Sequence, residues 1–138
     1  MKRYLLDTSL FAGFLHNRAK AIEMITPWVK NHEVATSILV YGEVIECLKG
    51  LSDFPAHYTN FHTVLQEIVP YPLTYPILER YADIRRSMRQ PHGKGIIGDI
   101  DTLIAATALE YDLTLVTIDR DFERVPNLKW QLVNLKAA

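Results

Sequence analysis

The sequence alternates short apolar runs with longer stretches of helical periodicity, and this alternation constrains the fold more than any other feature. Buried strands are predicted at residues 3–6, 33–36, 113–118 and 130–133. Helices are predicted at residues 8–15, 21–30 with an interruption near Pro27, 37–50, 55–67, 75–89 and 101–111. Strands that alternate with helices are typical of a parallel sheet with helices on both faces. The length of 138 residues suits one domain, residues 1–138, with one core.

The composition is that of an ordinary globular protein, with 49% hydrophobic and 22% charged residues. A formal net charge of −1 argues against passive binding of nucleic acid through bulk charge, although bound metal and a local basic patch can still neutralise phosphates. No apolar run reaches the roughly 20 residues that a membrane span needs. Cys47 is the only cysteine, so an intrachain disulfide is impossible and we expect a cytoplasmic protein without a membrane partner.

Two acidic residues stand directly after predicted strands. Asp7 follows the first strand, and Asp119 follows the strand at residues 113–118. In parallel α/β sheets, ligands and chemistry collect beyond the carboxyl ends of the strands. Each acid alone has an ordinary structural explanation, because Asp7 can cap a helix and Asp119 can begin a turn. The pair is more informative than either residue.

Three further acids lie on or next to predicted helices. Glu43 has Leu39, Val40 and Cys47 as helical neighbours, so its charge borders an apolar face and is costly unless something pairs with it. The exposed edge of an amphipathic helix explains it equally well. Asp99 and Asp101 precede or open the helix at residues 101–111, where the helix dipole stabilises negative charge. One of them suffices as a cap, and the second is surplus.

Together these acids predict a carboxylate cluster. Several carboxylates cannot stay ionised side by side without a cation. Oxygen-only ligands select Mg²⁺, or Mn²⁺ as its substitute, over zinc. Such ions can hold a phosphate and activate water, so the expected reaction is hydrolysis of a phosphodiester.

Four segments, taken in order, resemble the PIN-domain ribonucleases, and in particular the VapC-type toxins of prokaryotic toxin–antitoxin pairs. They read LLDTS at residues 5–9, YGEV at 41–44, IGDIDTLIAATA at 97–108 and LVTIDRDF at 115–122. The first segment alone is a weak signal, whereas the third and fourth at this spacing are specific. Ser9 stands where the family more often has Asn.

The resemblance implies a three-layer α/β/α sandwich with a central, mostly parallel sheet. It implies a Mg²⁺-dependent endoribonuclease that acts on RNA, forms a homodimer and is inhibited by a cognate antitoxin protein. Its catalytic and metal-binding acids would be Asp7, Glu43, Asp101 and Asp119. Asp99 and Asp121 are secondary candidates, because each lies two residues from one of the four.

Candidate contacts with the substrate fall into two groups. Polar residues beside the acids are Thr8, Ser9 and Thr117. The richest basic region includes Arg85, Arg86, Arg89 and Lys94. A run of charges is usually a solvated helix face, but this one is also a candidate rim that guides a phosphate backbone toward the acids.

Other motifs in the sequence support functions other than a nuclease less well. Residues 93–98 match G-x-G-x-x-G, but no predicted strand precedes them, and Asp99 and Asp101 would repel a pyrophosphate. The histidines and Cys47 lack the spacing of a zinc site. A housekeeping RNA-processing PIN nuclease and a catalytically silent PIN-like interaction module remain as alternatives, and the presence of all four acids favours an enzyme.

Overall fold

The centre of the molecule is a five-stranded sheet in which every paired strand is parallel. The computed structural model describes residues 1–91 and 93–136. The sheet has the order β3-β2-β1-β4-β5. Its strands are β1 (Tyr4–Leu6), β2 (Val34–Ser37), β3 (Val69–Tyr71), β4 (Thr114–Thr117) and β5 (Trp130–Leu132).

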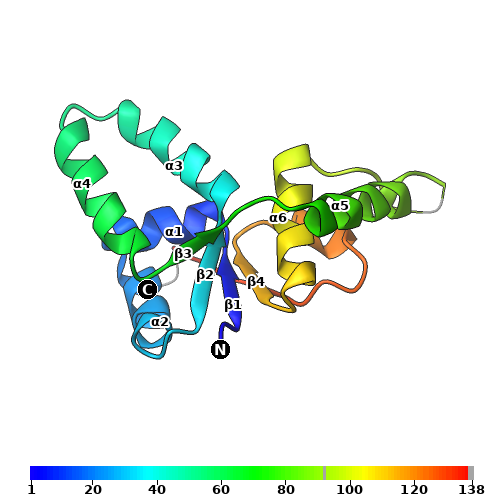
Figure 1. Ribbon diagram of the computed structural model, residues 1–138, viewed down its shortest axis with the longest axis horizontal. Coiled ribbons are helices and arrows are strands. Elements are labelled where there is room, and N and C mark those ends of the chain that lie inside the picture. The colour runs from blue at the N-terminus through cyan, green and yellow to red at the C-terminus, as the bar shows by residue number, and fades with distance from the viewer. Residues whose placement is uncertain (92, 137–138) are drawn as a thin grey trace.

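Helices cover both faces of this sheet, which confirms the predicted three-layer α/β/α sandwich. The helices are α1 (Thr8–Leu15), α2 (Ala19–Lys30), α3 (Ile38–Lys49), α4 (Phe54–Leu65), α5 (Tyr75–Met88) and α6 (Asp99–Glu110). Figure 1 shows α1 to α4 on one side of the strands and α5 with α6 on the other. Within the described residues, no helix is long and apolar enough to cross a membrane.

The inner strands of the sheet carry a large part of the core. Leu5 and Leu6 of β1, with Leu115 and Val116 of β4, are almost wholly buried. Burial of an aliphatic side chain of this size contributes about 1.5–3 kcal/mol. The small buried residues Ala105, Ala106 and Ala108 of α6 allow that helix to pack closely, and this fixes its N-terminal end near the strand ends.

The sequence encodes the starts of several helices through capping side chains. Asp7 caps α1 by accepting a hydrogen bond from the amide of Thr8. Ser37 caps α3 by accepting one from the amide of Leu39, and Thr74 caps α5. A cap of this kind contributes about 1 kcal/mol. Because Asp7 and Ser37 directly follow or end parallel strands, α1 and α3 both begin at the carboxyl edge of the sheet.

The structure corrects three parts of the predicted fold. Helix α2 is not interrupted at Pro27 but continues to Lys30. Trp28, which directly follows Pro27, stacks on Tyr4 with ring centroids 3.8 Å apart. Strand β3 was missed because it contains Pro70, which cannot donate to a ladder. The strand tolerates Pro70 because β3 lies at the edge of the sheet. A short 3₁₀ helix, η1 (Arg120–Arg124), was also not predicted.

Candidate active site

The four predicted acids line one open hollow at the carboxyl edge of the sheet. Asp7 and Asp119 follow the adjacent parallel strands β1 and β4, Asp101 lies in the first turn of α6, and Glu43 comes from α3. The hollow has a volume of about 450 Å³ and is lined by Asp7, Thr8, Ser9, Glu43, Asp101, Ile118, Asp119 and Arg120. We call it the acid hollow. Residues from four separate parts of the chain therefore meet at one place.

Asp7 is the most buried of these acids and has a fixed orientation. Its side chain is 7% exposed. One carboxylate oxygen accepts the amide of Thr8 at 2.8 Å, and the other accepts the hydroxyl of Thr117 at 2.8 Å. Burial raises the pKa of Asp7, the two hydrogen bonds oppose this, and the nearby charges of Glu43 and Asp119 raise the pKa further.

Two threonine side chains hold the acids in place. The hydroxyl of Thr8 donates to Oε1 of Glu43, so Thr8 binds Asp7 through its amide and Glu43 through its side chain. Thr117 is fully buried, and its hydroxyl also accepts the amide of Asp119 at 3.1 Å. Two of the three polar candidates for substrate contact thus have partners inside the protein. Ser9 lines the acid hollow.

The electrostatic strain of the site is greatest at Asp101. Burial, and after it the negative charges of Asp7, Asp119, Glu43 and Asp121 in that order, raise the pKa of Asp101 to about 6. None of the ion pairs within the described residues includes any of the four acids that line the hollow. The acids are therefore close enough to repel one another and have no cationic side chain bound to them.

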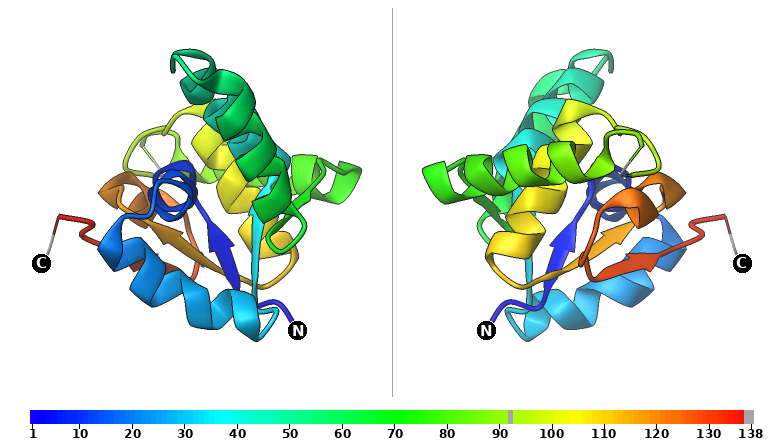
Figure 2. Two further views of the ribbon diagram at one scale, coloured as in Figure 1. Left: turned by 90° about the vertical axis from the view of Figure 1, so that its left-hand side faces the viewer. Right: turned by 90° about the vertical axis from the view of Figure 1, so that its right-hand side faces the viewer.

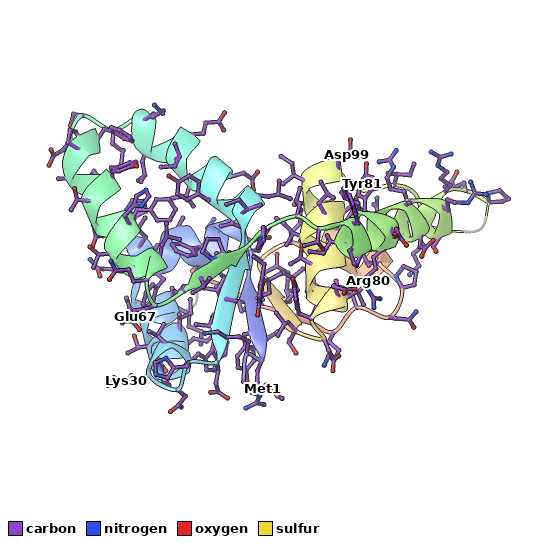
Figure 3. All side chains as sticks on the ribbon, in the orientation of Figure 1. Met1, Lys30, Glu67, Arg80, Tyr81 and Asp99 are labelled. Carbon is purple, nitrogen blue, oxygen red and sulfur yellow. The ribbon has the colours of Figure 1, made fainter. Side chains whose placement is uncertain are left out.

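The two secondary candidates lie outside the acid hollow and already have cationic partners. Asp99 forms an ion pair with Arg85 and accepts the hydroxyl of Tyr81 at 2.9 Å. Figure 3 shows Tyr81 next to Asp99 at one end of α6. Asp121 lies 3.8 Å from the guanidinium of Arg124. The geometry therefore separates Asp101 and Asp119, which face the hollow, from their acidic neighbours.

The basic residues are arranged differently from the predicted rim. Arg85 is bound to Asp99, and Arg86, Arg89 and Lys94 do not line the acid hollow. Arg120 does line it, and sequence analysis did not select this residue. Arg120 is not part of the basic run that suggested the rim. Its position directly after Asp119, at the end of a strand, is the sequence signal that could have predicted its place at the site.

The donor set has the chemistry of a site for a hard divalent cation, because all four groups are carboxylates. Among residues 1–91 and 93–136, however, no group of three or more His, Cys, Asp or Glu side chains is arranged to hold a metal ion as it stands. The residue types nevertheless fit Mg²⁺ or Mn²⁺.

Comparison with known proteins identifies the domain. A family model described as the PIN domain matches residues 4–128, which is most of the chain. No curated protein sequence matches the chain.

Solved structures resemble the whole fold. A chain of VapBC2 from Rickettsia felis, bound to a DNA fragment from their promoter, superposes with a TM-score of 0.82 and 22% identity, covering 95% of this chain and 98% of that one. DNA-bound VapBC from Salmonella typhimurium gives 0.83 and 18%, with the same coverage. VapBC-1 from nontypeable Haemophilus influenzae gives 0.80 and 22%, covering 94% and 96%. At these identities the likeness establishes the fold.

Proposed function

The chain belongs to the PIN-domain family, and from that premise we propose that it is a metal-dependent endoribonuclease. The substrate is RNA, and the reaction is hydrolysis of a phosphodiester by water. The acid hollow is the catalytic site, with Asp7, Glu43, Asp101 and Asp119 as its carboxylates.

One observation carries this proposal, namely the convergence of four carboxylates in an open hollow where no cationic side chain of residues 1–91 and 93–136 forms an ion pair with them. Such an arrangement lowers stability, because each charge raises the cost of ionising the others. Strongly perturbed carboxyl groups in a cleft are typical of functional sites. The raised pKa of Asp101, to about 6, is the clearest sign of this perturbation.

Each side chain has a role that follows from its surroundings. Thr8 and Thr117 hold Asp7 and Glu43 in fixed orientations, so these two acids need little reorganisation when a ligand arrives. Asp101 and Asp119 come from the first turn of α6 and the end of β4, and in the part of the chain that the structure describes no hydrogen bond ties their side chains to a second element. Arg120 supplies positive charge at the rim, where it can pair with a phosphate oxygen.

The four acids would hold Mg²⁺ or Mn²⁺, and the bound ion would supply the positive charge that lets an anionic phosphate approach them and that activates water. Neutralising the acids also removes their mutual repulsion. The loss of repulsion should be largest at Asp101, because its pKa is raised the furthest towards neutrality.

The test is cleavage of a labelled RNA by the purified protein. We expect cleavage with Mg²⁺ or Mn²⁺ and none after chelation by EDTA, with recovery when excess metal is returned. A single-stranded DNA of the same sequence is the matched substrate control. Undiminished cleavage in EDTA would contradict the metal mechanism, and absence of cleavage under all metal conditions would favour a silent interaction module.

We further propose that the protein is the toxin of a toxin–antitoxin pair. Support comes from the resemblance of the four sequence segments and from solved structures of VapBC complexes, which share its fold. An unguarded RNA-cutting site would harm the cell, and an arginine from an inhibitor could pair with two carboxylate oxygens in the acid hollow. The inhibitor would thus occupy the place of metal or phosphate.

Expression in cells tests the partner. The protein alone should slow growth, whereas co-expression of the small protein encoded beside it should restore growth and yield a stable complex. The complex should still form with Asp101→Asn, because apolar burial supplies most of the affinity at such interfaces. Normal growth with soluble, RNA-cleaving protein and no co-purifying partner would indicate a housekeeping RNA-processing nuclease instead.

A further inference from the structure

A second hollow adjoins the acid hollow and has the opposite electrostatic character. It has a volume of about 750 Å³. Its basic residues are His16, Arg18, Arg120 and Lys136, and none of the described residues that line it is acidic. We call it the basic hollow. Ser9, Ile118 and Arg120 line both hollows, so the two lie side by side.

The walls of the basic hollow are apolar and partly exposed. Ile118 is 45% exposed and Leu132 is 36% exposed, and both face the cavity with Ala12, Val133 and Leu135. A volume in the range of about 300–1,000 Å³ is usual for sites that hold a small organic group. The combination of cations with an apolar surface suits a ligand that has both an anionic and an apolar part.

The hollow is built by contacts between distant segments. The guanidinium of Arg18 donates to the carbonyl of Leu135 at 3.1 Å and ties the C-terminal segment to the start of α2. Gly13 permits this approach, because a Cβ at that position would meet Leu135 at 3.3 Å and Ala21 at 3.4 Å. Figure 2 shows the C-terminal segment leaving the sheet beside α1 and α2. These contacts hold the C-terminal segment in place as one wall of the basic hollow.

The cations of the basic hollow can pair with an anionic ligand. Within the described residues, none of the ion pairs involves Arg18, Arg120 or Lys136. Arg120 stands at the junction of the hollows, one residue from Asp119. A phosphate beside the acids would therefore have this guanidinium on the side that leads into the basic hollow.

We propose that the basic hollow binds the nucleotide next to the cleaved phosphate in single-stranded RNA. The phosphate of that nucleotide pairs with Arg120 and Lys136, while its base packs on Ile118 and Leu132. Single-stranded nucleic acids are commonly bound by a positive groove that also offers surface to the bases. This inference rests on the proposed function, because it assumes that the acid hollow cuts RNA.

Binding measurements in the uncleaving Asp101→Asn background test the assignment. Fluorescence anisotropy with a short labelled RNA gives the Kd and its dependence on salt. Arg120→Gln and Lys136→Gln should each raise the Kd several-fold and reduce the log–log salt slope by about 0.7, the value for one lost phosphate contact on a single strand. Leu132→Ser should raise the Kd without changing the slope. Lys30→Gln, a charge change at the end of α2, is the control and should change neither.

Each outcome separates this inference from the proposed function. If wild-type protein cleaves RNA but the three variants bind it as the control does, the basic hollow is not a nucleotide site and the proposed function stands. If the protein neither binds nor cleaves RNA, both fail. If the variants lose the co-expressed partner protein while their RNA affinity is unchanged, the basic hollow is a protein-docking surface and the inference is overturned.

Discussion

Two aspartates at the start of α6 occupy opposite electrostatic environments although only one residue separates them. Asp99 is exposed, paired with Arg85 and hydrogen bonded by Tyr81, a group that we call the α5–α6 clamp. Asp101 faces the acid hollow, where its neighbours are other carboxylates. Both residues lie where the helix dipole favours negative charge. The difference between them lies in what neutralises the charge.

The contrast distinguishes an acid that stabilises the fold from one that is kept for chemistry. An exposed ion pair such as that of the α5–α6 clamp contributes at most about 1 kcal/mol. Asp101 works against stability, because burial and neighbouring charges raise its pKa to about 6. Sites that bind ligands often retain such unfavourable groups at the expense of stability. The following experiments test whether this division of roles holds.

The largest expected effect is on cleavage by Asp101→Asn. Loss of one ligand charge should reduce RNA cleavage at least about a hundredfold, since each 1.4 kcal/mol of lost transition-state stabilisation is tenfold in rate. The variant should fold, because an amide can still lie in the first helical turn. Single-turnover cleavage with circular dichroism measures both.

Asp99→Asn is the matched control for this experiment, because it makes the same chemical change two residues away. Its cleavage rate should stay within about threefold of wild type, an energy difference below about 0.7 kcal/mol. If Asp99→Asn lost activity and Asp101→Asn kept it, the assignment of the two residues would be reversed.

A smaller effect is expected from Thr117→Val, which removes the hydroxyl bound to Asp7 and keeps the shape of the side chain. Loss of a group that orients a metal ligand typically reduces activity about 10- to 100-fold. Thr107→Val removes a buried hydroxyl whose one hydrogen bond within the described residues is to the carbonyl of Leu103, so it should leave cleavage unchanged. Equal losses in both variants would indicate a general packing defect.

Sequence analysis predicted the parts of this molecule that depend on local pattern. The position of Asp7 and Asp119 followed from the rule for parallel strands. The alternation of elements predicted a parallel sheet with helices on both faces, which is confirmed. Strand β3 and the continuity of α2 were missed because tertiary contacts outweigh the local cost of Pro70 and Pro27. Boundaries elsewhere differed by one or two residues, as at Asp99, where α6 begins.

The sequence could not predict the details of the site that depend on side-chain direction. The inward hydroxyl of Thr117 and the bond between Thr8 and Glu43 join residues far apart in the chain, so no spacing rule reveals them. The partner of Asp99 was equally hidden, since Arg85 was noted only as one member of a basic run. Whether the four acids hold metal stays a prediction that the cleavage experiment must test.

The α5–α6 clamp should affect stability and not chemistry. Arg85→Gln removes the ion pair with Asp99 and should lower the free energy of unfolding by about 1 kcal/mol or less. Urea denaturation measures this loss, which should shrink at high salt because exposed charges are screened. A large fall in cleavage together with unchanged stability would show that the clamp serves the active site.

The smallest effect expected is a pH-dependent difference in stability between wild type and Asp101→Asn, measured without metal. The pKa of Asp101 is about 6 in the folded protein, above the ordinary value of 3.8. Between these values the folded state binds more protons than the unfolded state, so stability from this group rises as pH falls from about 7 toward 4. Asp101→Asn lacks the group, and should therefore be the more stable protein at pH 7.

This advantage should be on the order of 0.5–1 kcal/mol, because Asp101 is partly exposed and solvent weakens the repulsion it feels. It should diminish on acidification as Asp101 becomes protonated in wild type. Excess Mg²⁺ at pH 7 should remove it as well, because a cation in the acid hollow offsets the same repulsion and stabilises only the protein that binds it. Urea titrations of both proteins at several pH values, with and without Mg²⁺, measure these changes. A constant difference across pH, unaffected by Mg²⁺, would mean that Asp101 is no more strained than Asp99, and the contrast between the two aspartates would fail.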